Sequence, residues 1–261
     1  MTFRLVRVLA ACAVVVALAL VGFGVVHARA AAGGPVRLVV LPSLAPAASP
    51  SSGPKPAAVA RWQVLKAVGP IVAYRAPSTS SPVKARFART TVSGYPSVFL
   101  VQGVRVVDGT TWYHVWLPIR PNESHGWIKE GGVAVYTTMA RIVIRLGARR
   151  LTVYVRDRAV ASFPVAVGMP QLPTPTGVYY IDEKLRPTTP GGPYGVLALG
   201  ISAFQPKLPS WPLGGPVAIH GTNQDDLIGQ AVSHGCVRMH NADVLRVSAL
   251  VPTGSPVVIV K

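Results

Sequence analysis

The sequence predicts a mainly β fold, on the basis of its composition and of short strand-like runs. Of the 261 residues, 50% are hydrophobic and 13% are charged, and the chain contains 25 prolines and 25 glycines. This hydrophobic fraction suffices for a packed core, whereas frequent Pro and Gly favour a turn-rich β protein over a helical one. Runs of alternating or β-branched residues recur between the turn signals. A chain of this length forms one large domain or two modest ones.

The N-terminal segment 1–30 is typical of an export signal. Arg4 and Arg7 precede 19 uncharged residues, 8–26, and the triplet Ala28-Arg29-Ala30, with small residues at its first and third positions, follows. The apolar run approaches the ~20 residues that span a bilayer. Two outcomes stay open: cleavage after Ala30, or retention as an anchor in the cytoplasmic membrane. Either outcome exports the rest of the chain to the cell wall or to the outer face of that membrane.

Residues 31–58 are predicted to form a linker. The segment is rich in Pro, Ala, Ser and Gly. Such a composition is typical of an extended spacer and not of a packed domain.

Residues 60–136 are predicted to form a small β domain. Strand-like alternation covers residues 98–107 and 112–117, with the turn signal Asp108-Gly109 between them. The order of these motifs, which ends at Gly126-Trp127-Ile128, resembles bacterial SH3-like domains, which often accompany cell-wall enzymes. Aromatic residues at this spacing are typical of a barrel core, and a ligand groove is the alternative.

The strand pattern restarts at residue 139 and predicts a second β domain. Strand-like segments lie at residues 141–146, 151–155, 159–167, 178–181, 217–219 and 257–260. One helix is expected over residues 242–250, with Asn241 as its cap. Residues 182–216 are rich in Pro and Gly and predict a long loop beside the functional site.

A cysteine near the C-terminus follows histidine-bearing turns and is a candidate nucleophile. Cys236 is one of two cysteines, and Cys12 lies in the apolar N-terminal run. A cysteine attacks a carbonyl only as its thiolate, so a base must take its proton. His220 precedes Cys236 by 16 residues. The imidazole and the thiol could meet if the strand at 217–219 ends where the turn at 233–236 begins.

The residues around the thiol suit acyl chemistry, but two other interpretations stay open. Gly235 permits a tight turn whose N–H groups could converge into an oxyanion hole, and Arg238 could bind a substrate carboxylate. Alternatively, Cys236 could ligate zinc together with His220, His234 and His240. The thiol could also be an inert small hydrophobic group among structural histidines.

Residues 219–241 resemble the catalytic motif of the L,D-transpeptidase, or YkuD, family. That motif is a histidine, a stretch of a dozen or more residues, Ser or Thr followed by His-Gly-Cys, and finally Asn. In this sequence the motif starts at His220, continues at Ser233 and ends at Asn241. The resemblance extends over residues 139–261. It implies a β-sandwich-like mixed sheet with short helices, so the whole chain is expected to be an SH3-like small barrel followed by this catalytic domain.

The resemblance also implies a role for each motif residue. Cys236 would be the acyl-forming nucleophile and His220 its base, oriented by a backbone carbonyl around Gly221. The backbone of His234, Gly235 and Cys236 would supply the oxyanion hole. The residues that would shape the site are Ser233, Arg238 and Asn241.

The activity that the resemblance implies is peptidoglycan L,D-transpeptidation, which forms 3→3 cross-links between stem peptides through a cysteine acyl-enzyme. No metal or organic cofactor is expected. The expected partners are peptidoglycan stem peptides, the cell-wall polymer and, if the N-terminal segment is uncleaved, the cytoplasmic membrane. Water or a protein as acceptor would give an L,D-carboxypeptidase or a protein-to-peptidoglycan transferase. A different class of protein, a wall-binding module with an inactive catalytic domain, is a further alternative.

The positive charge is concentrated in the first part of the chain. The net charge is +17, and the 12 Lys and Arg that precede the first acidic residue, Asp108, give residues 1–107 a charge of +12. Such a charge can attract anionic lipid, acidic wall polymer or nucleic acid. The alternative is that the charge has no binding function and follows only from an Ala-, Val- and Arg-rich composition. The sequence lacks the helix-turn-helix, zinc-finger and stacking-aromatic patterns of nucleic-acid binders, so we expect no nucleic-acid partner.

Overall fold

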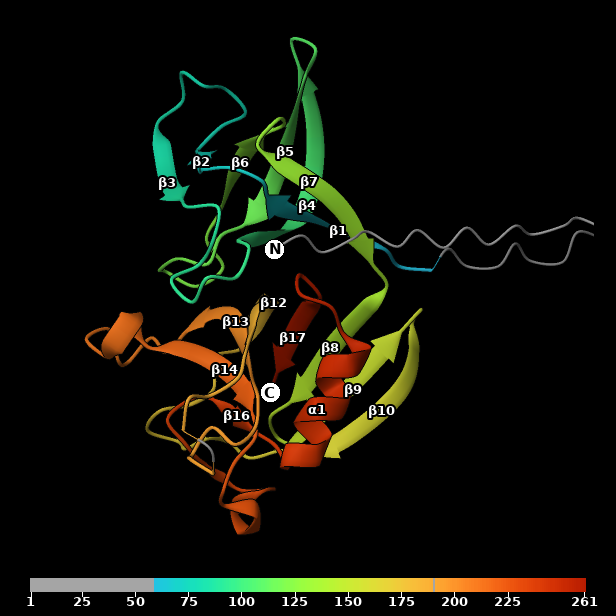
Figure 1. Ribbon diagram of the computed structural model, residues 1–261, viewed down its shortest axis with the longest axis vertical. Helices are drawn as coiled ribbons and strands as arrows, with labels where there is room; N and C mark the ends of the chain where they lie inside the picture. Colours follow the sequence, from blue (N-terminus) through green and yellow to red (C-terminus); the bar gives the residue numbers. More distant parts are fainter. Residues whose placement is uncertain (1–58, 190) are drawn as a thin grey trace, which may run out of the picture. The chain divides into compact units, whose positions relative to one another are not determined.

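The computed structural model describes residues 59–189 and 191–261 (Figure 1). The predicted export segment 1–30, with Cys12, and the predicted linker 31–58 lie outside the described residues. Within the described residues, no helix is long and apolar enough to cross a membrane.

The first part of the described chain forms a seven-stranded antiparallel sheet. Its strands are β1 (Trp62–Ala67), β2 (Ile71–Tyr74), β3 (Val83–Phe87), β4 (Val98–Val107), β5 (Thr110–Trp116), β6 (His125–Lys129) and β7 (Val133–Thr138), in the order β3-β2-β6-β5-β4-β1-β7. Asp108 and Gly109, at φ 48° and 72°, form the predicted turn between β4 and β5. The core of this first sheet is a buried cluster that includes Leu65, Phe99 and Ile128. The likeness to SH3-like domains stays a prediction.

The second part forms an eight-stranded mixed sheet. Its strands are β8 (Ala140–Arg145), β9 (Arg150–Val155), β10 (Arg158–Pro164), β12 (Gly177–Leu185), β13 (Ala198–Phe204), β14 (Pro216–His220), β16 (Val237–Arg238) and β17 (Pro256–Val260), in the order β10-β9-β8-β17-β12-β13-β14-β16. The pairs β8–β17 and β14–β16 are parallel, and the others are antiparallel. A short parallel pair joins β11 (Val167–Gly168) to β15 (Ala231–Ser233). The prediction of a mainly β protein with a mixed sheet is confirmed.

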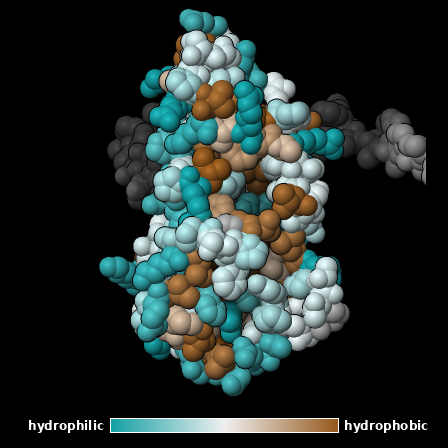
Figure 2. All heavy atoms as spheres, turned by 90° about the vertical axis from the view of Figure 1, so that its left-hand side faces the viewer, coloured by the Kyte–Doolittle hydropathy of each residue, from teal (hydrophilic) through white to brown (hydrophobic). Residues whose placement is uncertain are grey.

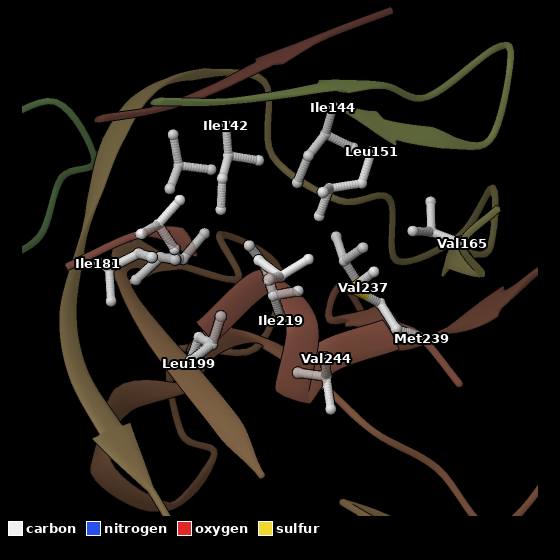
Figure 3. Close-up of a cluster of buried hydrophobic side chains, with 14 of the residues drawn as sticks. Ile142, Ile144, Leu151, Val165, Ile181, Leu199, Ile219, Val237, Met239 and Val244 are labelled. Atoms are coloured by element: carbon white, nitrogen blue, oxygen red, sulfur yellow. The ribbon is translucent and has the colours of Figure 1, made fainter. Parts of the chain in front are cut away.

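The mixed sheet is curled, and the buried side chains on its inner face form the core of the second part together with those of the helix. Figure 3 shows Ile142, Ile144 and Leu151 from β8 and β9 opposite Ile219 of β14 and Val244 of α1 (Asn241–Leu250). All five side chains are fully buried. Complete burial of an aliphatic side chain stabilises a fold by about 1.5–3 kcal/mol, so this cluster holds the strands that carry the site.

Two local predictions were wrong. Residues 182–216 were expected to be a loop, but β12 extends to Leu185 and β13 occupies the middle of the segment. β13 is buried on both faces and therefore lacks polar alternation. The helix α1 begins at Asn241, and its N-cap is His240. Asn241 is thus the first residue of the helix, and its side chain binds the backbone at Val196 and Thr222 instead of capping the helix.

The two sheets share a small buried cluster. Val64, Val98 and Leu100 of the first sheet pack with Tyr180 of β12. Next to this cluster, Tyr136 Oη donates a hydrogen bond to the Thr253 carbonyl at 2.9 Å. On the face that Figure 2 draws, hydrophobic residues are interspersed with hydrophilic ones over both parts of the chain.

Candidate active site

Two parallel strands at the edge of the mixed sheet bring the imidazole and the thiol together. β14 pairs with β16 so that Ile219 lies opposite Val237 and His220 lies opposite Arg238. Side chains alternate between the two faces of a strand, and Ile219 and Val237 belong to the core. His220, Arg238 and Cys236, which precedes β16, therefore share the opposite face. They line one pocket there.

That pocket has a volume of about 120 Å³, and two loops complete it. Tyr194 comes from the loop before β13, and Trp211 comes from the loop after it. The Tyr194 ring lies 4.9 Å from the His220 ring, and the Trp211 ring lies 6.0 Å from the His234 ring. The Pro- and Gly-rich loops therefore form aromatic walls around the site.

His220 is buried and is held in one tautomer. Its Nδ1 lies 2.5 Å from the Gly221 carbonyl oxygen. A carbonyl only accepts hydrogen bonds, so Nδ1 carries the hydrogen and donates it, and Nε2 of the neutral ring has a free lone pair. Burial lowers the pKa of His220 to about 4; the bond to Gly221 opposes this shift, and the charge of Arg238 adds to it. His220 is therefore a neutral base at neutral pH.

Cys236 is a free thiol whose surroundings favour the protonated form. Burial raises the pKa of Cys236, while the backbone amide of Ala218 and the positive charge of Arg238 act in the opposite direction. Together with the low pKa of His220, the raised pKa of Cys236 favours a neutral thiol and a neutral imidazole in the same pocket over an ion pair.

A hydrogen-bonded turn fixes the backbone before the thiol. Ser233 Oγ accepts a hydrogen bond from the Gly235 amide at 3.1 Å and donates one to the Cys236 carbonyl at 2.5 Å. Gly235 has φ 122°, which only glycine adopts readily. A Cβ at Gly235 would also lie 2.5 Å from Nε2 of Gln205. Among residues 59–189 and 191–261, the amides of His234 and Cys236 have no hydrogen-bond partner.

The comparisons with known proteins show which family the chain belongs to. The family model described as L,D-transpeptidase catalytic domain, YkuD, matches residues 139–259. The chain is 40% identical over 124 residues to the putative L,D-transpeptidase YkuD of Bacillus subtilis, which is 48% of this chain and 68% of that protein. The chain belongs to the L,D-transpeptidase (YkuD) family. The family prediction is thereby confirmed, and with it the prediction of an enzyme.

Two further similarities cover different shares of the chain. The putative L,D-transpeptidase YkuD of Bacillus licheniformis is 42% identical over 117 residues, which is 45% of this chain and 63% of that protein. A solved L,D-transpeptidase from Mycobacterium smegmatis aligns with 62% of this chain and 98% of its own at 17% identity, with a TM-score of 0.40.

The last motif residue of the L,D-transpeptidase, Asn241, holds the backbone that follows His220. Asn241 Nδ2 donates to the Thr222 carbonyl at 3.0 Å, and Oδ1 accepts from the Val196 amide at 3.1 Å. A Cβ at Gly221 would collide with this same Oδ1. Asn241 and Gly221 therefore fix the loop whose carbonyl orients the imidazole.

The guanidinium of Arg238 has both a bound and an unbound hydrogen-bond donor within the described residues. Its Nη1 donates to Gln224 Oε1 at 3.0 Å. Its Nε is buried and finds no hydrogen-bond partner in the described part of the chain. An acidic group that entered the pocket could accept this hydrogen bond.

The zinc alternative lacks a ligand set in this geometry. His240 is directed to Asp225, with Nδ1 3.1 Å from Oδ1, and His234 is exposed. Among the residues that the structure describes, no group of three or more His, Cys, Asp and Glu side chains could hold a metal ion.

Three further residues of the site were not found from the sequence. Tyr194, Gln205 and Trp211 line the pocket beside the motif. They lie outside the motif in sequence, and loop packing brings them there. The one available signal was the Pro- and Gly-rich composition of the segment that contains them.

Proposed function

We propose that this L,D-transpeptidase joins peptidoglycan stem peptides outside the cytoplasmic membrane by 3→3 cross-links. Cys236 is the nucleophile and His220 is the base. The observation that carries the proposal is that both side chains line one pocket while the Gly221 carbonyl leaves Nε2 of His220 as proton acceptor.

The reaction proceeds in two acyl transfers. The thiol proton passes to His220 Nε2, and Cys236 Sγ bonds to the carbonyl carbon of the third residue of a tetrapeptide stem. The bond to the terminal D-alanine breaks, and its amine leaves with the proton from Nε2. The side-chain amine of a second stem then attacks the thioester carbon and gives a proton to His220. The C–S bond breaks, and the departing sulfur takes the proton from Nε2 of His220, which regenerates the thiol and the neutral imidazole.

The turn before the thiol offers backbone N–H groups that can donate hydrogen bonds to the negative oxygen of each tetrahedral intermediate. The Gly235 amide is engaged by Ser233, so the amides of His234 and Cys236 are the donors we assign to the oxyanion hole. Arg238 would bind a carboxylate of the donor stem, because its buried Nε lacks a partner among residues 59–189 and 191–261.

A second cavity favours transfer to another stem over hydrolysis. It measures about 330 Å³, and Glu183, Leu213 and Ala198 are among its lining residues. Cys236 and Trp211 line both this cavity and the pocket of His220. A two-substrate transfer needs an approach to the thioester for each stem, and two cavities that meet at the thiol supply them.

The proposal is tested by intact mass after exposure to a carbapenem, a β-lactam that acylates an activated thiol. We expect one adduct on the wild-type protein and none on Cys236→Ala. Incubation with a tetrapeptide stem then distinguishes the acceptor. Cross-linked dimers support the transpeptidase, whereas tripeptide alone would indicate an L,D-carboxypeptidase. A folded wild-type protein without an adduct would contradict the proposed acyl-enzyme and favour the wall-binding module.

A surface of the first sheet favours binding to the cell-wall polymer. In a surface that we call the aromatic face, His114 stacks on Trp127 at 4.7 Å, His125 lies 4.8 Å from His114, and Arg105 lies 5.4 Å from the Trp127 ring centre. Residues 59–138 contain nine Lys and Arg and three Asp and Glu. Flat rings suit sugar rings, and the positive charge suits the carboxylates of the wall.

A further inference from the structure

The first sheet contacts the end of β13 through one loop. Asn122, between β5 and β6, donates from Nδ2 to the Phe204 carbonyl and accepts from the Phe204 amide at Oδ1, both at 2.8 Å. These two bonds to one residue resemble the pairing of a neighbouring strand. In the same loop, Arg120 Nη2 donates to the Gln205 carbonyl at 2.8 Å, and the guanidinium lies 5.3 Å from the Phe204 ring centre.

Gln205 connects this contact to the turn that carries the thiol. Its side chain is 3% exposed. Nε2 donates to the Pro173 carbonyl and to the His234 carbonyl, both at 3.0 Å, and Oε1 accepts from the Lys207 amide at 3.2 Å. Both Nε2 partners are carbonyls, which only accept, so the orientation of the side-chain amide is fixed.

The bond to His234 holds one end of a peptide plane next to the thiol. The carbonyl of the His234–Gly235 peptide is bound by Gln205, and its N–H is bound by Ser233 Oγ. A plane held at both ends cannot rotate without breaking one of these hydrogen bonds, and the bond between the Gly235 amide and Ser233 is buried, so that its loss would be costly. The next amide along the chain is that of Cys236, the oxyanion donor assigned above.

We propose that Gln205 is a positioning residue for the oxyanion turn, and that the first sheet maintains this position through Asn122 and Arg120. The first sheet is then part of the scaffold of the active site, in addition to any wall binding. This inference rests on the proposed acyl chemistry of Cys236.

The first test replaces Gln205 by Glu, which keeps the shape but puts an acidic oxygen opposite the His234 carbonyl. Two rates are measured on the full chain: acylation by a carbapenem, which needs the oxyanion hole, and alkylation by iodoacetamide, which needs only the thiol. Misplacement of a catalytic group by about 1 Å costs about 100-fold in rate, so we expect Gln205→Glu to slow acylation by 10- to 100-fold. We expect alkylation to change by less than about threefold.

The second test changes a residue that connects the first sheet to β13, Asn122, and measures the effect on the active site. Asn122→Ala removes both bonds to Phe204 at a partly exposed position, and we expect about tenfold slower acylation from coupling of this kind. The double variant Asn122→Ala/Gln205→Glu should be no slower than Gln205→Glu alone, because both changes act on one element. Tyr136→Phe is the matched control, since it breaks another hydrogen bond, from the first sheet to the turn before β17. Its acylation rate should equal that of the wild type.

The outcomes separate this inference from the proposed function. Wild-type acylation together with unchanged acylation of Gln205→Glu and Asn122→Ala would overturn the inference alone. So would equal losses of acylation and alkylation, because general damage to the fold would explain them, or additive losses in the double variant. Absence of acylation in the wild-type protein would instead overturn the proposed function.

Discussion

At the scale of single residues, burial decides which protons the reacting pair holds before substrate binds. The pKa of His220 falls to about 4 and the pKa of Cys236 rises, in both cases chiefly because burial disfavours the charged form. At neutral pH the pair is therefore uncharged. In the proposed reaction the thiol proton would therefore move to Nε2 as the thiol attacks, and His220 would act as a general base in that step and not as the partner of a stored thiolate.

This neutral pair predicts the pH dependence of thiol alkylation. A raised pKa means that the thiolate of Cys236 becomes abundant only above the ordinary value of 9.0. We therefore expect the iodoacetamide rate to be low at pH 7 and to rise about tenfold per pH unit up to pH 9. An unstructured peptide with one internal cysteine, measured in parallel, should react faster at pH 7. A rate that is already at its plateau near pH 6 would show an ion pair and contradict this reading of the site.

At the scale of elements, the sequence predicts what depends on local pattern and misses what depends on packing. The strand at 98–107 and the turn at Asp108-Gly109 follow from alternation and turn chemistry. β13 was missed because burial on both faces removes the alternation that marks a strand. His220 and Cys236 were identified from one contiguous motif. Gln205 was not, because its role exists only where the end of β13 meets the turn before the thiol.

The strand β12 carries a partly buried acid, Asp182, that should weaken the fold above neutral pH. Asp182 Oδ1 is buried without a hydrogen-bond partner within residues 59–189 and 191–261. Burial first, and then the charge of Glu183, raise the pKa of Asp182 from 3.8 to about 7. The folded protein therefore binds this proton more tightly than the unfolded chain. Its contribution to stability is full below pH 3.8 and is lost as the pH rises to about 7.

Asp182→Asn tests this assignment, because the amide has no charge to bury. We expect the free energy of unfolding in urea to rise by on the order of 2 kcal/mol at pH 8, with a much smaller gain at pH 4. Asp226→Asn, at an exposed position, is the control and should change neither value. An equal effect of Asp182→Asn at both pH values would contradict a raised pKa.

At the scale of the whole molecule, our two proposals for the first sheet concern two different surfaces of it. One surface packs on the catalytic domain through Val64, Val98 and Leu100 and contacts β13 through Asn122. The aromatic face lies on β4, β5 and β6, among the basic residues of the same sheet. A change in the aromatic face should therefore alter attachment to the wall while the thiol chemistry stays intact.

This separation predicts the behaviour of Trp127→Ala in binding to purified peptidoglycan. The substitution removes the ring on which His114 stacks and over which Arg105 lies. Loss of a ring contact of this kind costs about 0.5–1.5 kcal/mol in addition to the buried area, so the affinity in a pull-down should fall by several-fold to about tenfold. Binding of the wild-type protein should also weaken with salt, because the attraction between exposed charges is screened. Val106→Ala, at an exposed valine of β4, should bind as the wild type does. If Trp127→Ala binds normally but loses carbapenem acylation, the aromatic face stabilises the fold and a different surface of the protein binds the wall.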